Sequence, residues 1–102
     1  MESADIGYIG ERHVVDHLIR HGYRIHHDTK GPGATDIVAY GDTDTLVIQV
    51  KTAIHPSTPD EASQLECSKL GLRAAMMKAK AVIAQVTIDS RGGLIKVVLR
   101  DA

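Results

Sequence analysis

Hydrophobic residues at the start of the chain recur with a helical period. Residues 4–21 place apolar side chains along one side of a helix, and Gly22 follows them as a stop signal. The next three residues, Tyr23, Arg24 and Ile25, favour extended backbone. The pattern therefore predicts a helix over residues 4–21 that is followed directly by a strand.

Two further β-rich segments lie close together in the middle of the chain. Residues 36–40 and 46–51 are rich in Ile and Val, and the turn-forming sequence Gly-Asp-Thr-Asp separates them at 41–44. Residues 28–35 precede them and have the composition of a loop. We expect residues 36–40 and 46–51 to form an antiparallel hairpin.

The second half of the chain carries a helix signal and then another hairpin signal. Thr58, Pro59 and Glu61 suit the N-cap, first and third positions of a helix, which predicts a helix from residue 58 to about residue 80. Two β-rich segments, 81–89 and 94–100, flank a turn. The predicted order is one helix, three strands, one helix and two strands, which defines an α/β fold.

Chain length and composition limit the class of protein. The chain has 102 residues, of which 43% are hydrophobic, so residues 1–102 are expected to form a single domain. No apolar run approaches the roughly 20 residues that a membrane helix needs. The N-terminus also lacks a secretory signal, and Cys67 is the single cysteine, which excludes an internal disulfide. We expect a soluble, cytoplasmic protein that has no membrane partner.

The distribution of charge is uneven although the formal net charge is only −1. Seven basic and two acidic residues fall between positions 63 and 100, so the rest of the chain is acidic. This asymmetry permits a basic binding face beside a carboxylate-bearing site. Lys69 and Arg73, one turn apart in the second predicted helix, either face a DNA backbone or belong to a solvated helix surface.

Glu11 occupies an unexpected position in the first predicted helix. Helical geometry places it on the same stripe as Gly7, Val15 and Leu18. A carboxylate that faces a core needs a cationic partner, such as a lysine or a metal ion. The alternative is a stripe edge from which the side chain reaches water.

Polar residues also interrupt the strand at residues 46–51. Gln49 and Lys51 lie on one face of it. If the turn pairs Tyr40 with Thr45, Asp36 lies opposite Gln49, and the three polar side chains share one end of the hairpin. The alternative is an ordinary surface salt bridge between Asp36 and Lys51.

These residues suit metal-assisted hydrolysis of a phosphodiester. Carboxylates from Asp36 and Glu11, the side-chain oxygen of Gln49 and a carbonyl near Val50 offer the hard oxygen ligands that Mg²⁺ prefers, and Mn²⁺ is expected to substitute. Lys51 can orient or deprotonate the attacking water and offset charge on the phosphoryl oxygens.

At this point the sequence resembles a known family, the PD-(D/E)XK or restriction-endonuclease-like nuclease superfamily, and within it the archaeal Holliday junction resolvase and Mrr-like groups. The resemblance rests on residues 10–11, 22–25, 35–39 and 46–51. It implies an αβββαβ core, a central mixed sheet flanked by helices, to which this chain adds a C-terminal strand.

The resemblance also implies roles for individual residues. Asp36 and Glu11 correspond to metal ligands, Gln49 to the second acidic position of the motif, and Lys51 to the catalytic lysine. Two residues depart from the family pattern: Thr35 replaces a frequent proline, and Gln49 replaces Glu or Asp. The neutral amide still offers an oxygen, but the missing negative charge weakens metal binding.

The expected function is that of a Mg²⁺-dependent endonuclease that hydrolyses DNA, with structure specificity of the Holliday junction resolvase kind. The alternative is a catalytically inactive nuclease-fold module that binds DNA or serves in assembly. A chain this short offers little surface for duplex DNA, so we expect a homodimer, with targeting supplied by a partner protein. Lys30 and Gly33, in the loop before Asp36, are expected to contact DNA together with Lys69 and Arg73.

Two other patterns have ordinary interpretations. His13, His17 and His21 form a ridge along the first helix, which indicates a polar helix face or, alternatively, a zinc site. In the second helix, apolar residues are expected to form the buried side: Leu65, Leu72, Met76, Met77 and Ala79.

Overall fold

The structure is a computed structural model that describes residues 3–28 and 36–102, with side chains described for 5–26 and 37–102. The elements follow in the order α1 (Ser3–Arg20), β1 (Arg24–Asp28), β2 (Asp36–Tyr40), β3 (Thr45–Ile54), α2 (Gln64–Met76), β4 (Lys80–Ile88) and β5 (Leu94–Asp101). This order is the one predicted from the sequence. The segment 29–35, which covers most of the predicted loop, lies outside the described residues.

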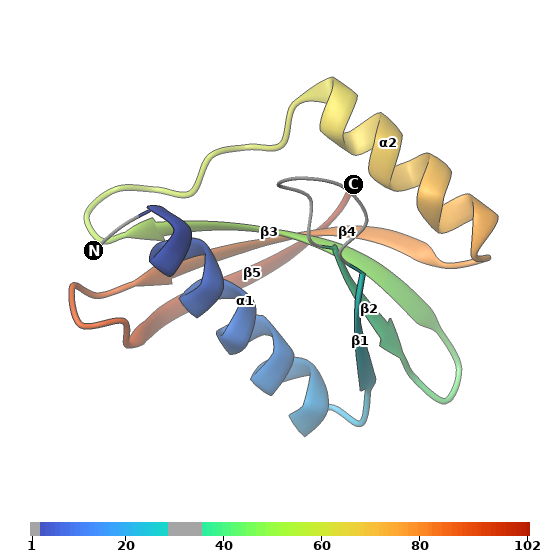
Figure 1. The fold of residues 1–102 in the computed structure, drawn as a ribbon, viewed down its shortest axis with the longest axis horizontal. Helices are drawn as coiled ribbons and strands as arrows, with labels where there is room; N and C mark the ends of the chain where they lie inside the picture. The colour runs from blue at the N-terminus through green and yellow to red at the C-terminus, as the bar shows by residue number, and fades with distance from the viewer. Residues whose placement is uncertain (1–2, 29–35) are drawn as a thin grey trace.

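The five strands form one mixed sheet in the order β1-β2-β3-β4-β5. The pairs β1–β2, β2–β3 and β4–β5 are antiparallel, whereas β3 and β4 are parallel. The parallel pair requires a crossover, and α2 lies within it. β2 pairs with β3 only as far as Ile37 and Ile48, so β1 and β2 turn away while β3 continues beside β4 (Figure 1).

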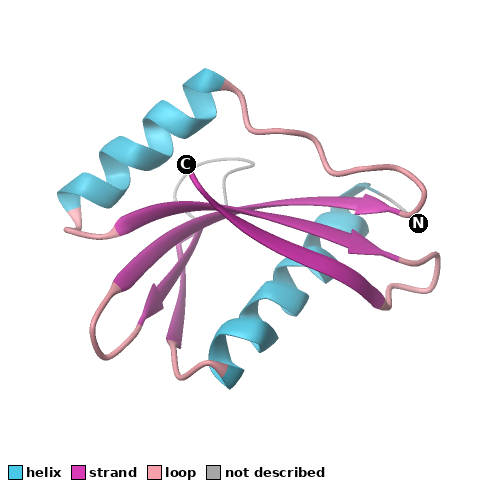
Figure 2. Cartoon of the chain, turned by 180° about the vertical axis from the view of Figure 1, so that it is seen from behind, coloured by secondary structure: helices cyan, strands magenta, loops and turns pink. Residues whose placement is uncertain are grey.

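The two helices cover opposite faces of the sheet (Figure 2). Alternation along the strands sends one set of side chains toward α1 and the other toward α2. The α1 side holds the larger core, which consists of Val14, Val15, Leu18, Ile37, Ala39, Leu46, Ile48, Val82, Ala84, Val86 and Ile88. The α2 side holds a smaller one, formed by Val38, Val47, Leu70, Ala74 and Ile83. The small second core leaves polar positions on the α2 face uncovered.

The first helix ends where the sequence predicts. Gly22 has a φ of 88°, a conformation that glycine adopts without a steric penalty. The backbone N–H groups of Gly22 and Tyr23 donate to the carbonyls of Ile19 and Leu18, which satisfies the last turn. The Tyr23 hydroxyl then donates to the carboxylate of Asp44, 2.9 Å from Oδ2, and thereby ties the start of β1 to the β2–β3 turn.

The predicted start and end of the second helix are wrong. Residues 58–63 are not helical, and α2 begins after Ser63, whose side chain and that of Glu66 form a capping box. Both Thr58-x-x-Glu61 and Ser63-x-x-Glu66 match the capping pattern, and the structure uses the second, whose Glu66 contacts Lys51 of β3. The helix ends at Met76 rather than near Lys80, which opens β4.

The predicted buried side of α2 is also largely wrong. Leu65, Leu72 and Met76 are 63%, 67% and 80% exposed. Leu70 and Ala74 make the contact with the sheet instead. Leu70 and Ala74 lie nearly opposite Leu65, Leu72 and Met76 on the helix, so the apolar stripe on that other side remains in solvent. Within the parts of the chain that the structure describes, no helix is both long and apolar enough to cross a membrane.

Candidate active site

The β2–β3 hairpin has the register on which the predicted site depends. Tyr40 pairs with Thr45, and the pairing runs to Ile37 and Ile48. Extending this register by one residue brings the backbone position of Asp36, the first residue of β2, opposite Gln49. The side chain of Asp36 lies outside the described part of the structure, so its role stays a prediction.

Gln49 and Lys51 meet at a carboxylate that the sequence interpretation did not include. The Lys51 Nζ lies 2.6 Å from the Oε2 of Glu66, and the Gln49 Nε2 donates to the same oxygen at 3.0 Å. The side chains of Lys51 and Glu66 are 22% and 34% exposed, so the contact is open to solvent on one side. An amine, an amide and a carboxylate therefore converge on the α2 face of β3.

Glu66 is positioned by the start of α2. It is the third residue of the helix, and its Oε1 accepts a hydrogen bond from the backbone N–H of Ser63 at 3.0 Å. Its own backbone N–H donates to the Ser63 hydroxyl at 3.1 Å. One carboxylate oxygen thus caps the helix while the other contacts Lys51 and Gln49. This division of roles fixes the direction of the carboxylate.

These contacts strongly favour the ionised form of Glu66. The hydrogen bond from Lys51, followed by that from the Ser63 backbone, lowers the pKa of Glu66 from 4.5 to about 2. The side chain therefore carries a full negative charge near neutral pH. It is the acidic partner of both Lys51 and Gln49 at this contact.

Glu11 lies on α1, which packs on the opposite face of the sheet from α2. It is partly buried on α1, and its neighbour Gly10 is buried against Thr52, the residue after Lys51. From Gln49 onward, β3 pairs with β4 alone among the described strands, which leaves its other side open. That Glu11 joins Lys51 and Asp36 around a metal ion stays a prediction.

Val50 lies in β3 between the two polar residues and pairs with Ala84 of β4. Its side chain packs against the core on the α1 side. A strand carbonyl at this position stands next to Gln49 and Lys51 in the chain, as the sequence interpretation requires. Ligation of a metal ion by this carbonyl stays a prediction.

The four predicted DNA-contacting residues have different outcomes. Lys30 and Gly33 lie outside the described residues. Lys69 is exposed on α2, and Arg73 is partly buried in the last turn of the same helix. The contacts of all four with DNA stay predictions.

Each histidine of the ridge contacts another residue of the chain. The ring Nε2 of His13 lies 2.8 Å from the carbonyl oxygen of Gly92, and the ring Nδ1 of His21 lies 2.7 Å from that of His17. The rings of His17 and His21 contact each other with centroids 4.4 Å apart and planes tilted by 34°. Among the residues described, no group of three or more His, Cys, Asp or Glu is able to hold a metal ion. The zinc interpretation therefore gains no support.

Glu66 is the site residue that the sequence interpretation missed. Its signal was present as Ser63-x-x-Glu66, but the stronger Thr58-Pro59 pattern diverted the helix start. The contact with Lys51 spans 15 residues of sequence, and no local pattern reports such a pairing. Only the crossover geometry of β3, α2 and β4 brings the two side chains together.

The strand order and the two helices define an α/β fold class, with a mixed five-stranded sheet between two helices. A solved structure of this class, Hjc from Archaeoglobus fulgidus, a Holliday junction resolvase from an archaeal hyperthermophile, is similar to this chain. The match has a TM-score of 0.68 and 24% sequence identity, and covers 93% of this chain and 71% of that chain. It confirms the fold implied by the sequence resemblance. No protein-family model matches the chain, and no curated protein matches it in sequence.

Proposed function

We propose that this protein is a metal-dependent endonuclease that hydrolyses phosphodiester bonds in DNA, with a preference for branched structures such as the Holliday junction. The observation that carries the proposal is the convergence of Lys51 and Gln49 on the Glu66 carboxylate. The fold similarity to a Holliday junction resolvase supports the same class of reaction.

The donor set suits a hard divalent cation. Glu66 is ionised, Gln49 retains a side-chain oxygen, and the register carries Asp36 to the same end of the hairpin. Oxygen ligands of this kind suit Mg²⁺, and Mn²⁺ accepts the same set. Asp36, Glu11, Gln49 and the Val50 carbonyl would hold the ion, and Glu66 adds a third carboxylate charge beside the two of Asp36 and Glu11.

When bound, the ion would lower the pKa of a coordinated water and offset charge on the phosphate. The chain's own residues act around it. Glu66 holds the Lys51 amine at a fixed place on β3, where it can contact a phosphoryl oxygen as negative charge develops. Gln49 fixes the same carboxylate from a second direction. In-line attack by water would leave a 5′-phosphate and a 3′-hydroxyl, as the resemblance implies.

A second candidate function is a nuclease-fold module that binds DNA without cutting it. Gln49 favours this candidate because a neutral amide replaces a carboxylate at the centre of the motif. The ion pair between Lys51 and Glu66 also provides a metal-free arrangement in which neither charge is isolated. This module would bind DNA equally well with and without divalent ions.

A cleavage assay separates the two candidates. Purified protein is incubated with four-way, flapped and linear DNA in Mg²⁺ or Mn²⁺, and Lys51→Ala and Asp36→Ala are assayed beside it. We expect cutting of at least one branched substrate by the wild type and none by either variant, with unchanged circular dichroism spectra. Cleavage that persists in both variants would refute this active site.

Metal binding can be measured without turnover. A ligand that binds only the folded state raises the melting temperature, so Mn²⁺ should raise that of the wild type more than that of Asp36→Ala. An unchanged wild-type melting temperature, together with DNA binding in a chelator, would favour the noncatalytic module. The homodimer and the targeting partner protein are further parts of the proposal.

A further inference from the structure

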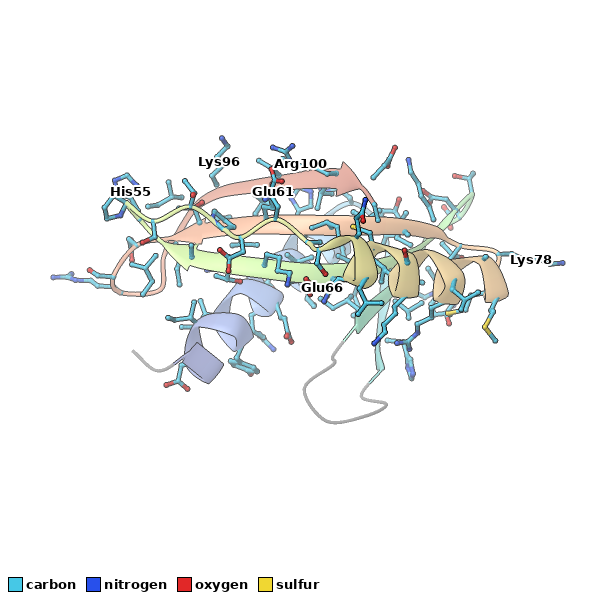
Figure 3. All side chains as sticks on the ribbon, turned by 90° about the horizontal axis from the view of Figure 1, so that it is seen from above. His55, Glu61, Glu66, Lys78, Lys96 and Arg100 are labelled. Atoms are coloured by element: carbon cyan, nitrogen blue, oxygen red, sulfur yellow. The ribbon has the colours of Figure 1, made fainter. Side chains whose placement is uncertain are left out.

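A groove lies beside the candidate active site, on the same face of the sheet. The segment after β3 crosses over β4 and β5 before it reaches α2 (Figure 3). A cavity of about 320 Å³ lies along it. Its lining residues are Thr58, Pro59, Glu61, Gln85, Thr87, Lys96, Val98 and Arg100, and we call this surface the β5 groove.

The strand register connects the β5 groove to the site. Gln49 pairs with Ile83, which in turn pairs with Arg100. Lys51 pairs with Gln85 in the same way. Directly paired residues point to the same face, and neighbouring strands are roughly 4.8 Å apart, so Arg100 stands roughly 10 Å across the sheet from Gln49. The groove therefore continues the polar surface that begins at Gln49 and Lys51.

The groove carries two cations, Lys96 and Arg100. Both are exposed, and neither makes an ion pair with any part of the chain that the structure describes. Both lie on β5, four residues apart, which is roughly 13 Å along a strand. The lining also contains Gln85, Thr87 and Thr58, whose amide and hydroxyl groups can donate to phosphate oxygens. Glu61 is the acidic residue of the lining.

We propose that the β5 groove binds the phosphodiester backbone of DNA through Lys96 and Arg100. The DNA bound there would continue toward Lys51 in the candidate active site. This proposal rests on the proposed function because it takes DNA as the substrate. Two cations along a strand, with neutral donors between them, complement a chain of phosphates better than a single bound anion. Glu61 opposes this binding and limits its strength.

The test measures DNA binding in a chelator, where cleavage cannot interfere. Binding of labelled duplex and four-way DNA is followed by fluorescence anisotropy over a salt series, for the wild type and the double variant Lys96→Gln and Arg100→Gln. The slope of log K against log salt is negative, and each lost phosphate contact reduces its magnitude by about 0.9. We expect the double variant to lose about 1.8 of that slope, and Glu61→Gln to bind more tightly than the wild type.

Lys78→Gln is the matched control. Lys78 lies beyond the C-terminal end of α2, away from the β5 groove (Figure 3). Like Lys96, it makes no ion pair with the described residues. Its removal costs one positive charge, so it measures the effect of net charge alone. A double variant that keeps the wild-type slope, or that loses no more slope per charge than Lys78→Gln, would overturn the groove.

The outcomes for the groove and for the proposed function are separable. All variants in this test keep residues 49, 51 and 66. If the wild type cleaves DNA and the groove variants bind DNA as the wild type does, the proposed nuclease function is supported and the DNA-binding role of the β5 groove is refuted. Reduced binding by those variants, with no cleavage under any metal, would support the groove and favour the noncatalytic module. If the wild type binds no DNA, both the DNA-binding role of the β5 groove and the proposed function are refuted.

Discussion

The Lys51 Nζ lies 2.6 Å from the Glu66 Oε2, and this contact joins the central strand β3 to the first turn of α2. Gln49, two residues before Lys51 on β3, donates to the same oxygen through its Nε2. The negative charge is thus supplied by the helix instead of the strand. Lys51 therefore has an acidic neighbour on α2, although position 49 carries a neutral amide.

The first prediction concerns the position of the carboxylate on α2 and not on β3. Glu66→Gln should lower DNA cleavage by about 100-fold, since a group that fixes a catalytic side chain or holds charge in the transition state contributes on that order. A double variant, Glu66→Gln with Gln49→Glu, returns the carboxylate to the strand and should recover part of the loss. Single-turnover cleavage rates with saturating Mn²⁺ measure both effects.

Asp60→Asn is the matched control for Glu66→Gln. Asp60 is exposed in the segment before α2, and its substitution also removes one negative charge. The variant should cleave DNA at the wild-type rate. Equal loss in Asp60→Asn and Glu66→Gln would show that net charge, and not the contact with Lys51, governs the rate.

The sequence predicted most of the fold but only part of this site. Gly22, the turn at 41–44 and the alternation of residues 46–51 are local signals, and each one placed its element correctly. The pairing of Tyr40 with Thr45 was the condition on which the predicted site depended, and the structure has this register. Glu66 could not be placed in the same way. Its contact with Lys51 depends on where α2 starts, and two capping patterns five residues apart competed for that start.

The second prediction concerns the stability of the fold in acid. The folded-state pKa of Glu66 is about 2, whereas the group titrates at 4.5 when unperturbed. Its stabilising contribution is therefore complete above about pH 4.5 and is lost as the pH falls toward 2. The free energy of unfolding of the wild type should exceed that of Glu66→Gln near neutral pH, and the difference should shrink across this window.

Urea unfolding of both proteins at several pH values provides the measurement. The Glu66 side chain is about a third exposed, so added salt should reduce the difference between the two proteins. A difference that is constant from neutral pH down to about pH 2 would show that the amide lost packing and not an ionic contact.

The third prediction concerns the exposed apolar side of α2. Leu65, Leu72 and Met76 lie on one side of the helix, nearly opposite Leu70 and Ala74. A second copy of the chain, packed with its own α2 antiparallel across this stripe, would cover the same residues in both copies. Leu72→Glu should therefore shift the proposed homodimer toward monomer without lowering the melting temperature of the monomer.

Sedimentation equilibrium over a range of protein concentrations measures this shift. Ser68→Glu serves as the control for charge because Ser68 is an exposed residue of the same helix at the edge of the stripe. It should weaken the dimer less than Leu72→Glu does. A wild type that stays monomeric at every concentration would contradict the homodimer.

The last prediction concerns the contact that sets α1 against β3. A Cβ atom at Gly10 would overlap the hydroxyl of Thr52, which is itself buried without a hydrogen-bond partner among the described residues. Gly10→Ala should therefore destabilise the fold by about 1–3 kcal/mol through overpacking. Gly71, within α2, provides the contrast: outside its own helical turn, no described atom lies within 4 Å of the position that a Cβ would take. Gly71→Ala should therefore stabilise the fold by about 0.5–1 kcal/mol.

A double-mutant cycle tests whether Gly10 and Thr52 are in contact. In Gly10→Ala with Thr52→Ala, removal of the hydroxyl and methyl groups should recover part of the loss, which the cycle measures as a coupling energy. Because Thr52 follows Lys51 and Gly10 precedes Glu11, a shift of α1 in Gly10→Ala should also reduce cleavage more than the loss of stability explains. Additive effects of the two substitutions would show that the helix does not rest on Thr52.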